Sequence, residues 1–416
     1  MLPRVVITGI GVVSPNGIGR EAFCRAILAG ESGVKRISRF DPAELPVQVA
    51  GEIPEFDELA WVDPRERKHV SRVVPLTVAA SREAVLDAGL DPAAMTMEEK
   101  REIGVVLGTG GGAQEFSEEQ YRLWHSGQVK HVSLFCIPSG TMGTISSEVS
   151  MRFGFRGYSH VVTAGCTSST DAIGYAFQHI QAGVQPLFLV GGVDSAITPG
   201  IIKGYSMLRA LTQSWNHAPE RASRPFSKDR DGFVIAEGSW MFILEELEHA
   251  RARGARIYAE IVGYGSTCEA FHRVRMSESP EEPARALTLA MAEAGIAAQD
   301  VQYVNLHGTS TEMNDRVETR ALKLAMGKQV ERIPMSGLKS QIGHAQGACG
   351  SAGVAATLIA IEHGKIPPTI NLEVADPECD LDYVPDVGRT ARIEHAICNC
   401  VGFGSKNSAL VLKKVA

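Results

Sequence analysis

Long hydrophobic runs are missing from this sequence of 416 residues, which bounds the kinds of protein it can be. Its first segment, "MLPRVVITGIGVV", contains one arginine, and Gly9 and Gly11 interrupt its apolar residues. Such a run is too short for a signal peptide or a membrane-spanning helix, so we expect a cytoplasmic protein with no membrane partner. A composition of 44% hydrophobic and 21% charged residues is typical of a globular protein with a large core.

Nucleotide-binding motifs are also missing. The glycine-rich stretches "GIGVVSPNG" and "GTGGGA" do not have the spacing G-x-G-x-x-G at the start of a helix, and the chain contains no G-K-[ST] loop. The net charge of −7 argues against general affinity for nucleic acids. We therefore expect no nucleotide cofactor and no nucleic-acid partner.

The eight cysteines are scattered along a long chain that shows no secretory leader, so we expect free thiols. The "CNC" stretch at residues 398–400 lies in an apolar, strand-like run without a second Cys/His pair at ligand spacing. We predict that these two cysteines pack in the core and that the protein holds no metal.

Segments of the first part of the chain recur in the same order in the second part. The pairs are "VVITGIG" with "AEIVGYG", "AASREAVLDAGLD" with "LTLAMAEAGIA", "IGVVLGTGGG" with "VQYVNLHGTST", and "AGCTSSTDAIGYAFQHIQAG" with "GACGSAGVAATLIAIEHG". Strand-like runs alternate with helix-like runs, which indicates an α/β protein. We predict an internal duplication, with one half at residues 1–254 and the other at residues 255–416.

Cys166 stands where a strand-like run gives way to a helical one, in "VTAGCTSSTDA". Unpaired N–H groups at the start of a helix favour an anion and lower the pKa of a thiol. A lone cysteine among small residues is more often an unreactive buried side chain. Cys166 can therefore be assigned as a nucleophile only if a base lies close to it. His307 in "VNLHGTST" and His344 in "LKSQIGHAQG" are candidates, because both follow apolar runs in glycine-rich turns.

Six motifs together resemble the β-ketoacyl-acyl-carrier-protein synthases, the condensing enzymes of fatty acid and type II polyketide synthesis. They are "AGCTSS", "LHGTST", "LKSQIGH", "RPFSKDRDGFVIAEG", "PPTINL" and "GFGS", and they span most of the chain. The resemblance implies a thiolase-like fold, duplicated in five α/β/α/β/α layers, and an assembly as a homodimer or as a heterodimer with a paralogous ketosynthase-like subunit. Several stretches look closest to the ketosynthase alpha chains of aromatic polyketide systems.

The resemblance also implies roles for individual residues. Cys166 would carry the acyl chain, His307 and His344 would stabilise the enolate formed from malonyl-carrier protein, and Lys339 would orient one histidine. The N–H groups of Cys166 and Phe403 would form an oxyanion hole, with Phe403 as a gate. The remaining implied residues are Thr309 and Thr311 on the pantetheine arm, and Asp315 and Glu318 as supports of the lysine region.

Acyl carrier protein is the partner that the resemblance implies, with substrates held on its phosphopantetheine and no cofactor bound to the enzyme. The basic stretch "DPRERKHVSR" contains Arg67 and Lys68, and Arg209 matches a further docking position. A solvated helix face is the plainer explanation for such a charge run.

Departures from the family pattern concern the acyl pocket and its gate. Gly111, Gly140 and Gly143 stand where relatives place larger residues, which predicts a roomier pocket; alternatively, Gly111 serves a turn that needs positive φ. Ser405 and Lys406 replace the usual continuation of the Gly-Phe-Gly gate. Two other functions stay open: a thiolase with Cys400 as second thiol, and a non-condensing chain-length-factor-like subunit, which would lack the nucleophile.

Overall fold

A computed structural model describes residues 2–415 and contains one large mixed sheet built from two similar halves. The principal strands of the first half are β1 (Val5–Ser14), β5 (Ile103–Gly108), β6 (Ser159–Val162), β7 (Leu187–Ser195) and β8 (Glu237–Glu246). Those of the second half are β9 (Ala259–Cys268), β10 (Tyr303–Asn305), β11 (Met335–Ser336), β14 (His395–Gly402) and β15 (Lys406–Lys413).

The two halves have the same strand order. The first runs β1-β8-β7-β5-β6 and the second β9-β15-β14-β10-β11, and they join where β1 pairs with β9 in an antiparallel register from Val5 opposite Ile261 to Ile7 opposite Ala259. In both halves the innermost strands are antiparallel to each other and the outer ones are parallel. This shared order agrees with the predicted duplication.

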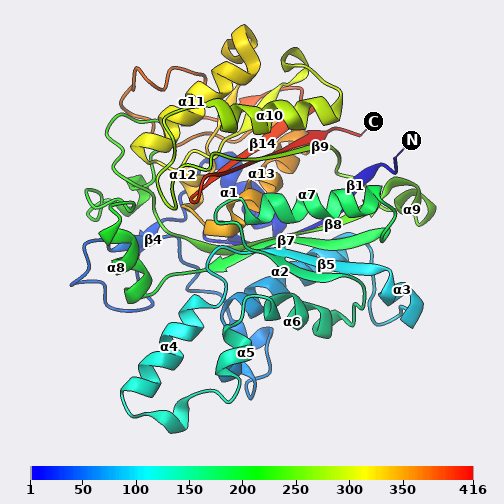
Figure 1. Ribbon diagram of the computed structural model, residues 1–416, viewed down its shortest axis with the longest axis vertical. Coiled ribbons are helices and arrows are strands. Elements are labelled where there is room, and N and C mark those ends of the chain that lie inside the picture. The colour runs from blue at the N-terminus through cyan, green and yellow to red at the C-terminus, as the bar shows by residue number, and fades with distance from the viewer. Residues whose placement is uncertain (1, 416) are drawn as a thin grey trace.

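Helices form three layers around the two halves of the sheet (Figure 1). The outer layers are α2 (Val73–Asp87) with α6 (Thr144–Phe153) on one side, and α10 (Glu281–Ala294) with α11 (Glu312–Met326) on the other. Between the sheets lie α7 (Ser168–Gln181) and α13 (Cys349–His363), which contact each other. The five layers are those of the thiolase-like fold, as expected.

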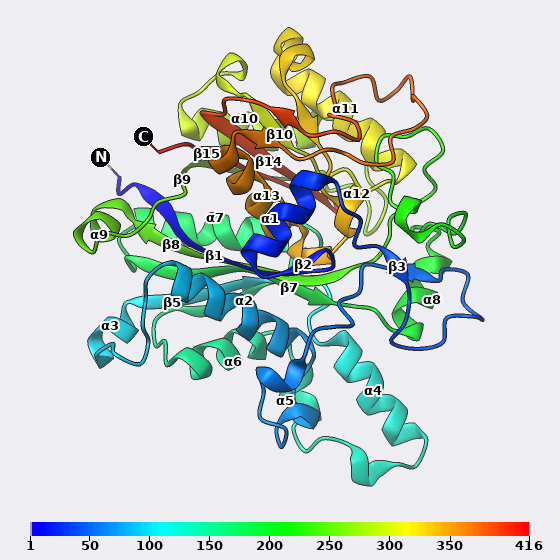
Figure 2. The ribbon, with the colours of Figure 1, turned by 180° about the vertical axis from the view of Figure 1, so that it is seen from behind.

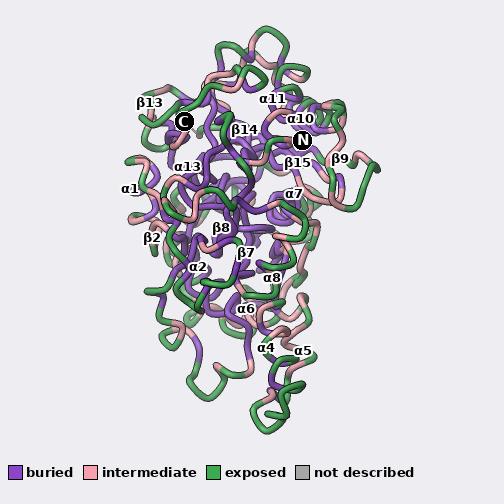
Figure 3. Tube along the Cα trace, turned by 90° about the vertical axis from the view of Figure 1, so that its left-hand side faces the viewer, coloured by how far each residue is buried: buried purple, intermediate pink, exposed green. Residues whose placement is uncertain are grey.

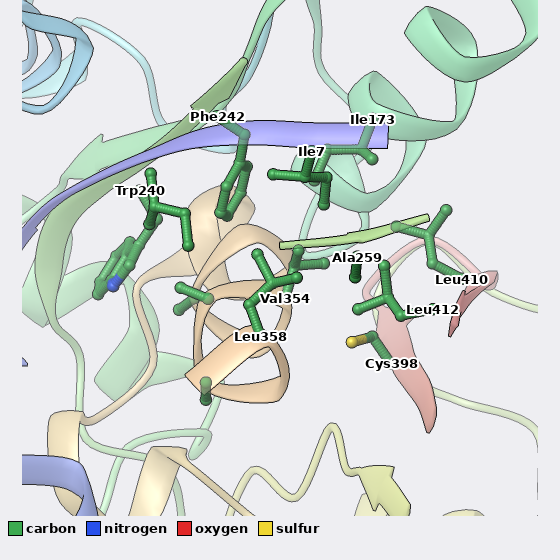
Figure 4. Close-up of a cluster of buried hydrophobic side chains, with 14 of the residues drawn as sticks. Ile7, Ile173, Trp240, Phe242, Ala259, Val354, Leu358, Cys398, Leu410 and Leu412 are labelled. Atoms are coloured by element: carbon green, nitrogen blue, oxygen red, sulfur yellow. The ribbon is translucent and has the colours of Figure 1, made fainter. Parts of the chain in front are cut away.

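The central layer is buried because both of its helices are covered by sheet on two sides. From Cys349 to Ile361 every residue of α13 is buried, and small residues such as Gly350 and Gly353 allow its close approach to α7 and β10. Figure 4 shows side chains of both halves meeting in this core, among them Ile7, Phe242 and Leu410. Burial of so much apolar surface is the main stabilising contribution to the fold.

The remaining elements lie at the edges of the layers (Figure 2). The helices are α1 (Arg20–Ala29), α3 (Met97–Arg101), α4 (Gln114–His125), α5 (Cys136–Gly140), α8 (Pro199–Met207), α9 (Leu247–Ala252) and α12 (Lys339–Ile342). The short strands are β2 (Gly17–Ile18), β3 (Lys35–Arg36), β4 (Val49–Ala50), β12 (Lys365–Ile366) and β13 (Arg389–Thr390). Helices α4 and α5 project from the body and are largely exposed (Figure 3).

Over residues 2–415 no helix is both long and apolar enough to cross a membrane. The segment between α9 and β9 carries the predicted boundary between residues 254 and 255, and this division into halves stays a prediction. The paired segments proposed from the sequence do occupy matching elements: β1 and β9, α2 and α10, β5 and β10, α7 and α13.

Candidate active site

Cys166 lies in the turn between β6 and α7, directly before the first turn of the helix. Gly165 has φ of +70°, which brings the chain out of the strand at an angle that a side chain would disfavour. The cysteine is 6% exposed and lines a cavity of about 500 Å³ that also contains His307 and His344. The structure therefore brings the three predicted chemical groups together.

His307 follows β10 in the turn that leads to α11. Glu318 of that helix accepts hydrogen bonds from the backbone N–H groups of His307 and Gly308, both at 2.7 Å. Lys339 Nζ lies 2.5 Å from the His307 carbonyl oxygen and 3.3 Å from its Nδ1. An ammonium that donates to Nδ1 leaves the ring proton on Nε2, so Lys339 determines which nitrogen of His307 can act as a donor.

His344 follows the short helix α12 and bonds to the segment that precedes β8. Its N–H donates to the carbonyl of Val234 at 2.7 Å, and its carbonyl accepts from Ala236 N–H at 3.0 Å. The N–H of Gln346 donates to His344 Nδ1 at 3.1 Å. The rings of His307 and His344 are 5.5 Å apart and nearly perpendicular, and a donor atom from each lies within 4.8 Å of Cys166 Sγ and of the other.

The electrostatics of the site favour a thiolate at Cys166. Burial raises the pKa of its thiol, but the charge of His344 and hydrogen bonds from His307 and His344 outweigh burial and lower it to about 6. Burial lowers the pKa of His344, and the charges of Cys166 and Cys349 more than offset this effect and raise it to about 9. Between these values the pair exists as thiolate and imidazolium, as in cysteine nucleophiles paired with histidine.

Thr309, Thr311 and Phe403 also line the cavity. The hydroxyl groups of Thr309 and Thr311 lie 2.8 Å apart, and Thr309 N–H donates to Asp315 at 3.0 Å. Phe403 lies in the turn between β14 and β15, with its ring 6.5 Å from that of Phe233. These positions are compatible with the roles that the resemblance implies for the three residues.

Ser405, which departs from the family pattern, ties the Phe403 turn to a neighbouring segment. It has φ of +66°, is 3% exposed, and its hydroxyl donates to the carbonyl of His272 at 3.1 Å. The N–H groups of Phe271 and His272 donate to the same hydroxyl, each at 3.3 Å. The turn is therefore anchored at its last residue.

Asp315 and Glu318 bond to the turn that carries His307. Glu318 accepts from the backbone N–H groups of His307 and Gly308, and Asp315 accepts from Thr309 N–H and from the N–H of Phe226 at 2.8 Å. They fix the turn that carries His307, because that turn leads directly into the helix on which they stand. Lys339 bonds to the His307 carbonyl in the same turn, and support of the lysine region by the two acids stays a prediction.

The three glycines predicted to widen the acyl pocket do not line the Cys166 cavity of the single chain. In the part of the chain that the structure describes, none of Gly111, Gly140 and Gly143 is among the residues that line it. Gly140 is the last residue of α5, and Gly143 directly precedes α6. The roomier pocket therefore stays a prediction. The positive-φ alternative is wrong for Gly111: Gly112 has φ of +53°, whereas Gly111 donates its N–H to Asp194 at 2.8 Å.

The basic stretch divides into residues of different kinds. Arg72 is buried and bonds through two nitrogens to Glu237, each at 2.8 Å, so it is an internal ion pair. Arg67 is half-buried and pairs with Glu58, and Lys68 is exposed. Arg209 is exposed and lines the cavity. Lys68 and Arg209 thus remain the residues best placed for a docking role.

Two residues of the site, Gln346 and Cys349, were missed by the reasoning from sequence. Gln346 lines the cavity, and its side-chain oxygen accepts a hydrogen bond from the Tyr205 hydroxyl at 2.9 Å. Cys349 lies in contact with Cys166, and so does Cys400, which the sequence offered both as core packing and as the second thiol of a thiolase. The signal for Cys349 was present, because "GACG" occupies in the second half the place of "AGCT" in the first.

A duplicated thiolase-like fold with a cysteine and two histidines on one cavity is the arrangement of condensing enzymes. Residues 3–250 match the family description "Beta-ketoacyl synthase, N-terminal domain", and residues 258–373 match "Beta-ketoacyl synthase, C-terminal domain". The chain belongs to the β-ketoacyl synthase family. It is an acyltransferase that forms carbon–carbon bonds by decarboxylative condensation.

Relatives come from two pathways. The chain is 40% identical over 411 residues to 3-oxoacyl-[acyl-carrier-protein] synthase 2 of Synechocystis, covering 99% of this chain and 98% of the relative. It is 41% identical over 422 residues to the tetracenomycin polyketide synthase ketoacyl synthase alpha subunit of Streptomyces glaucescens, covering 99% and 97%.

Solved structures of similar fold include a β-ketoacyl synthase from Burkholderia phymatum, with a TM-score of 0.91, 33% identity and full coverage of both chains. A second is a type II polyketide ketosynthase bound to a hexaketide and in complex with its acyl-carrier protein, with a TM-score of 0.91, 31% identity and full coverage of both chains.

Proposed function

We propose that this protein elongates acyl chains carried on the phosphopantetheine of an acyl carrier protein, with malonyl-carrier protein as the extender. The observation that carries the proposal is the joint placement of Cys166, His307 and His344 on one cavity. A chain-length-factor-like subunit would lack the nucleophile, and the thiolate-favouring surroundings of Cys166 argue for a condensing subunit.

In the first half-reaction the Cys166 thiolate attacks the thioester carbonyl of the acyl-carrier protein, and the phosphopantetheine thiolate leaves and takes the proton of the His344 imidazolium. The close approach of Gly402 to the Cys166 turn, where an added Cβ would stand 3.2 Å from Cys166 N, supports the N–H groups of Cys166 and Phe403 as donors to the oxyanion. Acylation removes the negative charge from Cys166. The pKa of His344 is then no longer raised by that charge.

In the second half-reaction malonyl-carrier protein loses carbon dioxide and forms an enolate. When the His344 ring is neutral, its Nδ1 accepts a hydrogen bond from the N–H of Gln346, so the ring proton is on Nε2. In the same way, the bond from Lys339 to Nδ1 of His307 keeps the ring proton of His307 on Nε2. Two Nε2–H donors then stabilise the enolate oxygen, and the enolate carbon attacks the acyl thioester on Cys166. The Cys166 thiolate leaves, and the product is a β-ketoacyl thioester on the carrier.

Acyl-enzyme mass spectrometry tests the proposal most directly. The purified protein is incubated with acyl-carrier proteins of different chain types, and the peptide containing Cys166 is examined for the added mass. We expect an acyl group on Cys166 from at least one carrier-bound substrate, and β-ketoacyl-carrier protein after addition of malonyl-carrier protein. An acyl group that forms only from coenzyme A esters would support a thiolase-like enzyme instead.

The carrier protein and a second subunit are the proposed partners. The edge strand β6 is only four residues long, its first two residues are exposed, and its outer edge pairs with no other strand within residues 2–415. Helix α6 contacts both β6 and α5, and apolar side chains of the α5 region are exposed, with Leu134 at 89% and Ile137 at 70%. Unpaired edges with apolar neighbours favour association, so β6 is the proposed dimer contact.

Light scattering tests this contact. The carbonyls of Tyr158 and Val162 accept from Val105 and Thr109, so alternate residues of β6 face β5 and the backbone N–H of Val161 faces the outer edge. A proline at Val161 removes that outer donor. We expect a dimer for the unmodified chain and a larger monomer fraction for Val161→Pro. A monomer in both cases would exclude the homodimer and leave a paralogous partner subunit to be tested by co-expression.

A further inference from the structure

Two cysteines lie directly behind the nucleophile and face each other. Cys349 is the first residue of α13 and Cys400 lies in β14, and their sulfur atoms are 3.7 Å apart. The Cys400 thiol donates to the carbonyl oxygen of Cys166 at 3.2 Å, and Cys349 Sγ lies 3.3 Å from the same oxygen. The two thiols are thus in contact with each other and with the backbone of Cys166.

Condensation as proposed above does not use this pair. Cys349 and Cys400 are 5% and 2% exposed, and the cavity that holds Cys166 is lined by other residues. Packing alone does not require two sulfur atoms in contact. By comparison, Cys398 lies two residues earlier on β14 and is buried against the Thr357 hydroxyl, at 3.1 Å.

We propose that Cys349 and Cys400 are a redox modification site that forms a reversible disulfide. A disulfide requires the sulfur atoms to approach to about 2.05 Å. The two sulfur atoms are 3.7 Å apart, so bond formation needs an approach of less than about 2 Å. The oxidant that the proposal names is a peroxide, and the reductant is a dithiol.

The surroundings of the two thiols differ in a way that assigns their roles. Burial raises the pKa of Cys349, but the hydrogen bond from Cys400 and the positive charges of Lys339 and His344 outweigh it and lower the pKa below the usual thiol value. Burial and the neighbouring Cys349 raise the pKa of Cys400. Cys349 is therefore the thiolate that reacts first, and Cys400 is the thiol that resolves the product.

The oxidation balances with hydrogen peroxide. The Cys349 thiolate attacks one peroxide oxygen, the O–O bond breaks, and hydroxide leaves and takes a proton from solvent, so that Cys349 becomes a sulfenic acid. The sulfur of Cys400 then attacks the Cys349 sulfur, the S–O bond breaks, and the departing hydroxide takes the Cys400 proton as water. Two thiols lose two electrons and two protons in total, and the peroxide becomes two water molecules.

Disulfide formation has a consequence for the active site that rests on the proposed function. A disulfide has no S–H group, so the Cys166 carbonyl loses its donor from Cys400. Cys400 Sγ also lies 3.5 Å from His307 Nδ1, and its displacement alters the surroundings of that ring. Oxidation is therefore expected to slow the decarboxylation that His307 assists.

Peptide mapping of the full-length Cys166→Ala protein tests the modification without interference from the reactive nucleophile. The reduced protein is treated with hydrogen peroxide, denatured, alkylated and digested. We expect one cross-linked peptide pair containing Cys349 and Cys400, lighter by two hydrogens and split by dithiothreitol. Retention of both free thiols, or oxidation of Cys349 that stops at a sulfinic acid, would overturn the proposal.

Matched variants in the same background show whether the cross-link is specific. Cys400→Ser and Cys349→Ser should each abolish it, whereas Cys398→Ser should leave it unchanged, because Cys398 is equally buried but lies against a hydroxyl. If one of the two variants that should lack the cross-link folds poorly, the other still tests the proposal. A cross-link that instead joins Cys398 to Cys400 would contradict the assignment.

Malonyl-carrier protein decarboxylation by the Cys166→Ala protein provides the functional readout. We expect peroxide to reduce this rate several-fold and dithiothreitol to restore it, with no peroxide response when Cys400→Ser is added, whatever its starting rate. A cross-link that forms without any change in decarboxylation would overturn the functional part alone. Absence of decarboxylation in the reduced protein would count against the proposed function, while the peptide mapping would still decide the disulfide.

Discussion

At the scale of single residues, the chemistry depends on the charge that each side chain carries at neutral pH. Cys166 and His344 shift each other's pKa in opposite directions, to about 6 and about 9, because each ion stabilises the other inside a buried site. The apparent values belong to the pair, since the two groups titrate together. The pH at which the Cys166 thiol becomes reactive therefore measures how strongly the two groups shift each other's pKa.

Alkylation by iodoacetamide should label Cys166 first, at a rate that rises with pH and reaches half its maximum near pH 6. The thiolate is the reacting form, and its fraction increases as pH rises through the lowered pKa. His344→Ala removes the principal stabilising charge and should move the midpoint upward, toward that of an ordinary thiol. The measurement is the pH dependence of labelling by peptide mapping. A midpoint near pH 8.5 in the unmodified protein would contradict the ion pair.

Cys166→Ala and His307→Ala should separate the two half-reactions. Cys166→Ala should abolish condensation and leave slow decarboxylation of malonyl-carrier protein, because the proposed enolate stabilisers are other residues. His307→Ala should lose decarboxylation as well, by about a hundredfold or more, the typical contribution of a positioned proton donor. Carbon dioxide release and β-ketoacyl product are measured in parallel. Equal losses of both activities in the two variants would count against this division of roles.

At the scale of elements, turns at strand ends position the reacting groups and buried acids hold the turns. Glu318 accepts from the two N–H groups at His307 and Gly308, and Asp194 accepts from Gly110 and Gly347 at 2.7 Å each. A buried N–H without an acceptor costs about 1–3 kcal/mol, so each acid stabilises its turn strongly. Asp194 thereby links the β5 turn of one half to the α13 turn of the other.

Gly111→Ile should destabilise the protein and should impair all substrates alike. An added Cβ would stand 3.3 Å from Ala196 Cβ and 3.3 Å from Asp194 Oδ1, and the residue does not face the described cavity. Overpacking of this kind costs about 1–3 kcal/mol. Denaturant unfolding and condensation with acyl chains of increasing length measure the two effects. Gly204→Ile is the control for unfolding, since nothing lies within 4 Å of its added Cβ.

If Gly111→Ile lost condensation activity only with longer acyl chains, Gly111 would line the acyl pocket after all. That outcome would mean that the acyl pocket extends beyond the cavity that one chain forms. The same series, measured in the dimer and in the monomer fraction of Val161→Pro, would then show whether the second subunit completes the pocket.

At the scale of the whole molecule, charge governs the encounter with the carrier. Carrier proteins are acidic, and this chain has a net charge of −7, so docking requires a local basic surface. Arg209 lies on the cavity and Lys68 is exposed, whereas Arg67 and Arg72 are already paired with acids. Of these four basic residues, Arg209 and Lys68 are therefore the two that can meet an acidic partner.

Arg209→Glu and Lys68→Glu should each raise KM for carrier-bound substrate several-fold, with a larger effect at low salt. Reversal of one exposed charge near an acidic partner is worth about 1 kcal/mol, and salt screens it. Small acyl thioesters without the carrier should show unchanged KM. Lys328→Glu is the control, since it lies past the far end of α11, about 22 Å along the helix from the cavity. An equal effect on both kinds of substrate would exclude docking.

The α/β class, the duplicated pattern and the positions of Cys166, His307 and His344 could be predicted from the amino acids alone. These features are encoded locally: strand and helix periodicity, glycine turns, and reactive residues at the ends of apolar runs. Because both halves repeat the same elements in the same order, aligning the two halves of the sequence also places Cys349 at the position equivalent to Cys166. The family motifs added the assignment of Lys339 to a histidine.

Which residues share a cavity could be learned only from the folded chain. Arg72 and Lys68 look alike in a basic stretch, yet one is buried against Glu237 and the other is exposed, because that difference depends on a strand far along the chain. Gly111 follows strand β5 in a glycine-rich turn like those of the site, but its N–H bonds to Asp194. Cys349 and Cys400 meet because α13 packs on β14 within the second half, and they lie behind Cys166 because α13 contacts α7 of the first half. Contacts between such distant segments leave no local pattern.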